Sequence, residues 1–127
     1  MKFNSSAVIF SVRDVQASMN YYREKLGFRD YFTFGDYGGM MIGDVEVHFA
    51  GPSIQSNRVT GESSVYIFCE GVDEYYHLLE ATGAMIVDPI MSYPYGMRDF
   101  VVEDPDGNLI TFGQQIDTEG RHVYNGN

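Results

Sequence analysis

The most restrictive feature of the sequence is a turn near its C-terminal end, residues 104–108, which read Asp-Pro-Asp-Gly-Asn. Proline fixes φ, aspartate and asparagine side chains hydrogen-bond nearby backbone groups, and glycine tolerates a positive φ, so the chain must reverse direction here. Branched and aromatic residues fill both flanking segments, 97–103 and 108–115. The sequence therefore predicts a β-hairpin that any fold of this chain has to include.

Two stretches of the chain share one order of elements, a strand, a helix and three further strands. Apolar residues at helical spacing follow Asp14 and Gly71, which are predicted to start the helices, and Gly27 and Gly83 can end them in left-handed backbone. The apolar positions match at an offset of about 57 residues, which indicates a duplicated unit. The strands are predicted at residues 7–12, 28–34, 39–42 and 45–49 in the first stretch and 65–69, 85–91, 97–103 and 108–115 in the second.

This pattern predicts an α+β fold in which two βαβββ modules form a single domain over residues 1–127. The modules span about 5–51 and 63–115, a polar connector joins them, and 117–127 is expected to be a loose tail. One face of each sheet takes its helix, so the other face must be covered or used. Pairing of the modules, within one chain or between two, would form a ligand cavity.

Composition excludes some classes of function. The net charge of −10, with only 8 Lys and Arg, argues against nucleic-acid binding. No apolar run is long enough for a membrane helix, the N-terminus lacks the apolar segment of a signal peptide, and the single cysteine, Cys69, cannot form an internal disulfide. We therefore expect a soluble cytoplasmic protein with a buried thiol. The acidic charge either favours cationic ligands or serves solubility alone.

Several motifs together resemble one family, the glyoxalase, bleomycin-resistance and extradiol-dioxygenase superfamily. These motifs are VRDV at 12–15, LGF at 26–28, GVDE at 71–74, which is the counterpart of VRDV in the second unit, and YGMRDFVVEDPDGN at 95–108. The resemblance covers roughly residues 5 to 115. It implies paired βαβββ modules around a cavity, usually in a dimer. The superfamily contains both metalloenzymes and metal-free binding proteins.

The resemblance also implies where a metal would be held. The ligand positions of the enzymes correspond to Ala7, Glu46, Ser64 and Thr111 in this chain. Glu46 alone is a good ligand, because alanine has no donor and neutral hydroxyls bind divalent transition metals poorly. This set predicts that the shared metal site is lost and that no cofactor is needed.

His48 leaves an alternative open. Side chains alternate across a strand, so Glu46 and His48 are predicted to share a face and could supply two metal ligands or an acid/base pair. The other reading is that His48 only hydrogen-bonds a neighbour at the cavity wall. The remaining histidines, His77 and His122, are expected to be exposed.

Within the superfamily the resemblance is strongest to bleomycin-resistance proteins, through DYGG at 36–39 and PYG at 94–96. Those proteins sequester the drug in grooves at a dimer interface and stack its rings between aromatic side chains. The matching aromatics are Tyr37 and Tyr95, which could equally cover loops as turn residues. Tyr66 is expected to line the cavity with Glu46 and His48. Arg98 could pair with its neighbour Asp99 at the surface or interface.

Three hypotheses follow from the sequence. The first is a metal-independent, dimeric protein that binds a planar or cationic small molecule through Tyr37, Glu46, His48, Tyr66 and Tyr95. The second is a metal-dependent lyase, isomerase or dioxygenase that uses Glu46 and His48. The third is an oligomerising domain whose cavity has lost any ligand. All three share the fold, so the fold does not choose among them.

Overall fold

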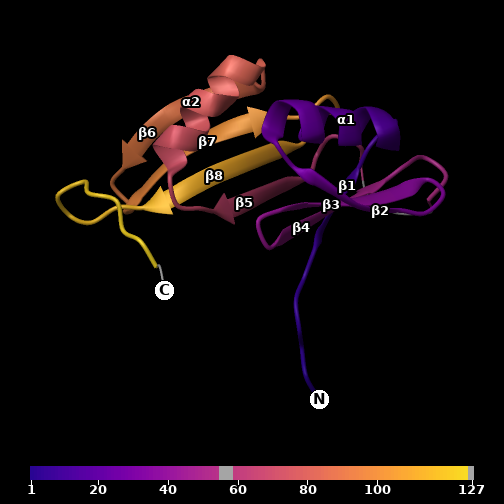
Figure 1. Ribbon diagram of the computed structural model, residues 1–127, viewed down its shortest axis with the longest axis horizontal. Coiled ribbons are helices and arrows are strands. Elements are labelled where there is room, and N and C mark those ends of the chain that lie inside the picture. The colour runs from indigo at the N-terminus through magenta and orange to yellow at the C-terminus, as the bar shows by residue number, and fades with distance from the viewer. Residues whose placement is uncertain (55–58, 126–127) are drawn as a thin grey trace. The chain divides into compact units, whose positions relative to one another are not determined.

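The computed structural model describes residues 1–54 and 59–125, and part of the predicted connector, 55–58, lies outside them. The chain divides into two compact units. The first comprises residues 1–63 together with the turn 104–108, and the second comprises residues 64–103 and the chain from 109 onward. Each unit contains one helix and one four-stranded sheet (Figure 1).

The first unit has the strand order β1-β4-β3-β2, with β1 parallel to β4 and the other pairs antiparallel. Its elements are β1 (Val8–Ser11), α1 (Val15–Leu26), β2 (Arg29–Thr33), β3 (Tyr37–Ile42) and β4 (Val45–Ala50). The second unit repeats this topology as β5-β8-β7-β6. Its elements are β5 (Ser64–Phe68), α2 (Val72–Thr82), β6 (Met85–Tyr93), β7 (Met97–Glu103) and β8 (Leu109–Gln115).

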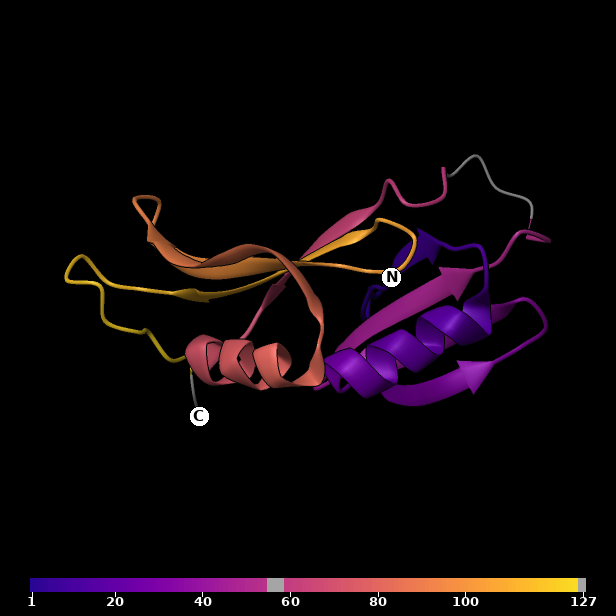
Figure 2. The same cartoon turned by 90° about the horizontal axis from the view of Figure 1, so that it is seen from above.

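Helix α1 begins and ends where the sequence predicts. The side chain of Asp14 accepts a hydrogen bond from the Ala17 N–H at 3.0 Å, and Gly27 ends the helix in left-handed backbone with φ of 79°. Its apolar stripe is buried against the sheet, and the Tyr22 ring lies edge-on to Phe49 of β4 at 4.7 Å between centroids. Burial of these aromatic rings fixes the helix on one face of the sheet (Figure 2).

Helix α2 starts differently, because Gly71 has no side chain with which to cap it. Gln114 of β8 supplies the acceptor instead: its Oε1 lies 3.0 Å from the Gly71 N–H and 3.2 Å from the Val72 N–H. Val72 and Leu79 are fully buried on the sheet side of the helix. A strand side chain therefore satisfies backbone donors that the helix start leaves free.

The predicted α+β fold of two βαβββ modules is confirmed, and so is the hairpin around 104–108. The boundaries of two strands differ from the prediction. Strand β3 begins at Tyr37, so this residue lies in the sheet and not in a turn. Strand β6 runs on to Tyr93, through two irregularities in its pairing with β7. Within the described residues, no helix is both long and apolar enough to cross a membrane.

The described chain after β8, up to residue 125, makes several hydrogen bonds, and the loose tail over 117–127 stays a prediction. The Asp117 carboxylate accepts the N–H groups of Glu119 and Arg121, and the Val123 N–H donates to the Gln115 carbonyl at 2.8 Å. His122 is partly buried rather than exposed, since its Nε2 lies 2.8 Å from the Asp73 carboxylate. His77 is exposed as expected. A polar composition does not reveal such contacts, because they depend on how the chain folds back.

Cys69 is only partly buried, although the sequence predicts a buried thiol. It follows the last residue of β5, and its N–H donates to the Gly113 carbonyl at 2.9 Å. Desolvation, with the nearby Glu70 charge, raises the pKa of its thiol to about 11. At neutral pH the protonated thiol is therefore favoured over the thiolate, which is the nucleophilic form.

Candidate functional site

The face of the first sheet that points away from α1, here called the first helix-free face, carries polar and aromatic side chains. Val47 and Phe49 of β4 are fully buried on the helix side. Because side chains alternate along a strand, Glu46 and His48 lie on the opposite face. Tyr37 of β3 joins them, since pairing of the two strands sets Tyr37 opposite Ala50 and Gly39 opposite His48.

These three polar residues form one hydrogen-bonded chain. The Tyr37 hydroxyl lies 2.7 Å from His48 Nδ1, and His48 Nε2 lies 2.5 Å from Glu46 Oε2. Both ring nitrogens of His48 are therefore occupied by protein groups. The prediction that Glu46 and His48 share a face is confirmed. His48 hydrogen-bonds two neighbours on this face, as in the alternative in which it is a residue of the cavity wall and not a metal ligand.

An aromatic ring covers this chain from β2. Phe32 lies edge-on to His48 at 5.2 Å between centroids and is stacked on Tyr37 at 6.1 Å with an interplanar angle of 25°. Phe32 lies so close to Gly39 that a side chain there would collide with its ring. A glycine in β3 thus makes room for an aromatic wall around the imidazole.

The corresponding face of the second sheet, the second helix-free face, is organised around a buried carboxylate. Asp99 of β7 is only 4% exposed, and its Oδ2 accepts hydrogen bonds from the Tyr66 hydroxyl at 2.8 Å and the Tyr95 hydroxyl at 2.9 Å. Tyr66 comes from β5 and Tyr95 from the turn between β6 and β7. Tyr66 lies against Gly113 of β8, where a side chain would collide with its hydroxyl.

Two further rings extend this cluster. Tyr93 and Tyr95 stack almost in parallel, with centroids 5.2 Å apart and an interplanar angle of 9°. Phe68 lies 4.9 Å from Tyr66 at a tilt of 38°. Tyr95 is 64% exposed, so one end of the stack is accessible. The geometry suits stacking of a flat ligand ring better than it suits a closed core.

Burial and the neighbouring carboxylate raise the pKa of both phenols. Desolvation and the hydrogen bond to Asp99 raise the pKa of Tyr66 well above its ordinary value and raise the pKa of Tyr95 to about 12. A phenolate beside a carboxylate would repel it, so the neutral phenols are favoured. At neutral pH both hydroxyls therefore donate to Asp99.

Arg98 and Asp99 do not pair with each other, contrary to one sequence expectation. Neighbouring residues of a strand point to opposite faces, so Arg98 lies on the helix side. There its guanidinium contacts the Asp73 carboxylate at 2.8 Å. Asp99 is left to the two tyrosines.

The predicted site residues thus fall into two sets. The first unit brings together Tyr37, Glu46 and His48, and the second brings Tyr66 and Tyr95 onto Asp99. The expectation that Tyr66 lies beside Glu46 and His48 joins residues of different units and stays a prediction. Sequence reasoning missed Asp99 and Tyr93 as members of the site. Strand alternation could have indicated Asp99, because the apolar residues Phe100 and Val102 mark the helix side of β7 and place Asp99 on the other face.

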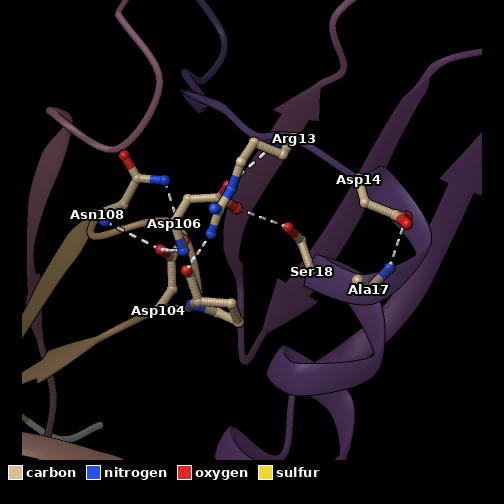
Figure 3. Close-up of polar contacts among 8 residues, drawn as sticks. Arg13, Asp14, Ala17, Ser18, Asp104, Asp106 and Asn108 are labelled. Atoms are coloured by element: carbon tan, nitrogen blue, oxygen red, sulfur yellow. Dashed lines mark hydrogen bonds and ion pairs between the residues drawn. The ribbon is translucent and has the colours of Figure 1, made fainter.

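The turn 104–108 serves the fold of the first unit. Asp106 Oδ1 accepts hydrogen bonds from the Arg13 Nε at 2.8 Å and the Arg13 N–H at 3.0 Å, beside the start of α1 (Figure 3). Asp104 is 2% exposed, and its two oxygens accept four hydrogen bonds. These come from the N–H groups of Asp106 and Asn108, the Asn108 side chain and the Tyr22 hydroxyl. Every carboxylate oxygen of the turn accepts a hydrogen bond from a group of the first unit.

The positions that the resemblance marks for metal ligands do not suit a divalent transition metal. Ala7 has no donor atom, Ser64 and Thr111 offer neutral hydroxyls, and Glu46 is engaged with His48. Among the described residues of either unit, no three His, Cys, Asp or Glu side chains are grouped as ligands. A metal would need a different set of donors from this one.

Comparison with known proteins identifies the family of the chain. The model of the Glyoxalase/Bleomycin resistance protein/Dioxygenase superfamily matches residues 5–112. The chain is 32% identical over 123 residues to the bleomycin resistance protein of Geobacillus stearothermophilus, covering 83% of this chain and 92% of that protein. A Staphylococcus aureus protein of the same name matches equally.

Solved structures show the same fold. The bleomycin-binding protein from bleomycin-producing Streptomyces verticillus, complexed with copper(II)-bleomycin, superposes with a TM-score of 0.73 at 25% identity, covering 88% of this chain and 96% of that one. TioX from Micromonospora sp. ML1 gives a TM-score of 0.76 at 22% identity, covering 95% and 100%. With its duplicated topology and the family match over most of its length, the chain belongs to the glyoxalase/bleomycin resistance protein/dioxygenase superfamily.

Proposed function

We propose that this protein binds a planar, cationic small molecule without changing it chemically, and that it acts by sequestration in the cytoplasm. The observation that carries the proposal is the parallel Tyr93–Tyr95 pair, whose exposed end can extend its stack onto a flat ligand ring. The net charge of −10 favours a cationic partner. Its relatives named bleomycin resistance proteins make bleomycin the first ligand to test.

Binding is proposed to need no metal or other cofactor from this protein, and the working form is proposed to be a homodimer. The absence of suitable donors at Ala7, Ser64 and Thr111 supports the first point. For the dimer the support is the resemblance, since related proteins hold their ligands between two chains. Tyr37, Glu46 and His48 on the first helix-free face are proposed as further ligand contacts, along with Tyr66 on the second.

The test is a titration of chelator-treated protein with metal-free bleomycin and copper(II)-bleomycin by calorimetry, with native mass spectrometry of the same sample. We expect a dimer that binds about two drug molecules and releases them unchanged on denaturation. Tyr95→Ala should weaken binding about tenfold, because one aromatic stacking partner is lost. The matched control is Tyr124→Ala, which removes a similarly exposed tyrosine elsewhere in the second unit.

A metal-dependent lyase, isomerase or dioxygenase is the second candidate; it would use Glu46 and His48, which lie together on the first helix-free face and would have to exchange their mutual hydrogen bond for a metal. Metal analysis of protein purified without chelator separates the two. A stoichiometric divalent metal that is lost in Glu46→Ala would establish the enzyme and overturn metal-independent binding. Drug binding that survives chelator and leaves the drug intact supports sequestration.

A further inference from the structure

We propose that Tyr66, Tyr95 and Asp99 form a subsite for a protonated amine, which recognises an N–H-bearing ammonium group next to the aromatic part of the ligand. This inference rests on the proposed function and names the chemistry of the cation that the site accepts. It assigns a role to Asp99, a residue that neither the charge pattern nor the metal positions indicated.

The cluster of Tyr66, Tyr95 and Asp99 contains one carboxylate and two phenols. A carboxylate that is 96% removed from solvent needs partners, and Asp99 has two neutral ones, the hydroxyls of Tyr66 and Tyr95. Within the described part of the chain, no Lys, Arg or His forms an ion pair with Asp99; the neighbouring Arg98 pairs with Asp73. The cluster therefore carries negative charge without a cation of its own.

Both hydrogen bonds of the cluster run from a phenol to the carboxylate. Each phenol gives its only hydrogen to Asp99, so its oxygen keeps lone pairs that can accept a hydrogen bond from outside. Hydrogen bonding to a carboxylate increases the negative charge on each phenol oxygen. Tyr66 is 37% exposed and Tyr95 is 64% exposed, so the buried charge acts at the surface through these two side chains.

The positions of the two hydroxyls define which ligand group can bind them. Both hydroxyls bond the same oxygen of Asp99, so one ammonium group can donate to both of them. The ring faces of Tyr93 and Phe68 beside them attract a cation and an attached apolar group. A quaternary ammonium keeps the charge but has no N–H to donate. The geometry points to primary and secondary alkylammonium groups attached to a flat ring.

The test uses three probes of one shape, 1-naphthylmethylamine, its N,N,N-trimethylammonium derivative and 1-naphthylmethanol, titrated at pH 7 into full-length protein with 13C-labelled tyrosine rings. The wild type should bind the amine about tenfold more tightly than either other probe, because only the amine forms charge-assisted hydrogen bonds. The ring signals of Tyr66 and Tyr95 should shift on binding.

Two variants remove the preference while keeping shape. Asp99→Asn removes the charge, and Tyr95→Phe removes one oxygen from an exposed ring and so avoids disturbing the buried side. In both, the affinity ratio of amine to trimethylammonium should fall towards one. Asp88→Asn, which removes an exposed charge from the same sheet, should leave the ratio unchanged.

The outcomes separate the subsite from the proposed function. Equal binding of all three probes by the wild type overturns the amine subsite and leaves stacking intact. A ratio that survives in both Asp99→Asn and Tyr95→Phe also overturns it. Binding of bleomycin with no binding of the amine probe rejects the subsite alone, whereas absence of binding by bleomycin and by every probe rejects the proposed function as well.

Discussion

The helix-free faces of the two units differ in chemistry although their strands follow the same order. The first is centred on the imidazole of His48, held between Tyr37 and Glu46, and the second on the carboxylate of Asp99, held between two phenols. The helix sides are alike, with buried Phe and Val residues under each helix. The two units therefore share the apolar pattern that determines the fold, while the polar residues on their helix-free faces differ.

The same contrast holds where each helix begins. In α1 the cap is local, since Asp14 accepts the N–H of a residue three positions later. In α2 it comes from Gln114, more than forty residues along the chain. The hairpins differ as well: β3 and β4 are joined through Gly43 and Asp44, whereas β7 and β8 are joined by 104–108, which belongs to the first unit. The start of α1 is thus capped by a local contact and the start of α2 by a distant one.

Removal of Asp104 should give the largest loss of stability. Asp104→Ala leaves the Tyr22 hydroxyl and the Asn108 side chain without their acceptor in a buried place, which should lower the free energy of unfolding by about 3 kcal/mol. Urea denaturation measures this change. The control Asp30→Ala removes an exposed ion pair with Arg23 and should cost less than about 1 kcal/mol. Equal losses would show that the turn does not stabilise the first unit.

Loss of the distant helix cap should cost more than loss of the local one. Gln114→Ala leaves two N–H groups at the start of α2 without an acceptor and should destabilise by about 2 kcal/mol. Asp14→Ala should destabilise by about 1 kcal/mol. The neighbouring exposed Gln115→Ala should stay within about 0.5 kcal/mol in the same denaturation experiment. A larger effect from Asp14→Ala would reverse the contrast between the two helix starts.

The smallest effect on stability is expected from Asp73, and it appears as the pH is lowered. Hydrogen bonding and charge from Arg98, with a further contribution from His122, hold the pKa of Asp73 below its usual value in the folded chain. A carboxyl with a lowered folded pKa stabilises the protein above its unfolded pKa of about 4, and this contribution disappears as the pH falls through the folded pKa. Asp73 is 34% exposed, so screening limits the contribution to about 0.5 kcal/mol.

Asp73→Asn should therefore flatten the fall in stability between about pH 5 and pH 2, measured by thermal unfolding across that range. Ser92→Ala removes a hydrogen bond from the same Arg98 without touching Asp73, and it should leave the slope unchanged. A slope that is the same in Asp73→Asn and wild type would mean that the Arg98 contact contributes nothing in solution.

Much of the fold was determined by local sequence. Helix α1 begins after Asp14 and ends at Gly27, because capping and left-handed backbone depend on residues close in the chain. The turn 104–108 forces a hairpin for the same reason. Alternation along one strand likewise placed Glu46 and His48 on a shared face. The prediction of two modules followed, because a repeated local pattern gives a repeated topology.

The tertiary structure alone decided the long-range polar contacts. Asp99 meets Tyr66 from a strand more than thirty residues earlier, Gln114 reaches the start of α2, and His122 reaches Asp73. None of these pairings has a sequence period, because hydrogen-bond partners are selected by strand register and by the folding back of the chain. The sequence therefore determined which faces the side chains occupy, and the packed structure determined which polar groups meet there, since hydrogen bonds act only over about 3 Å.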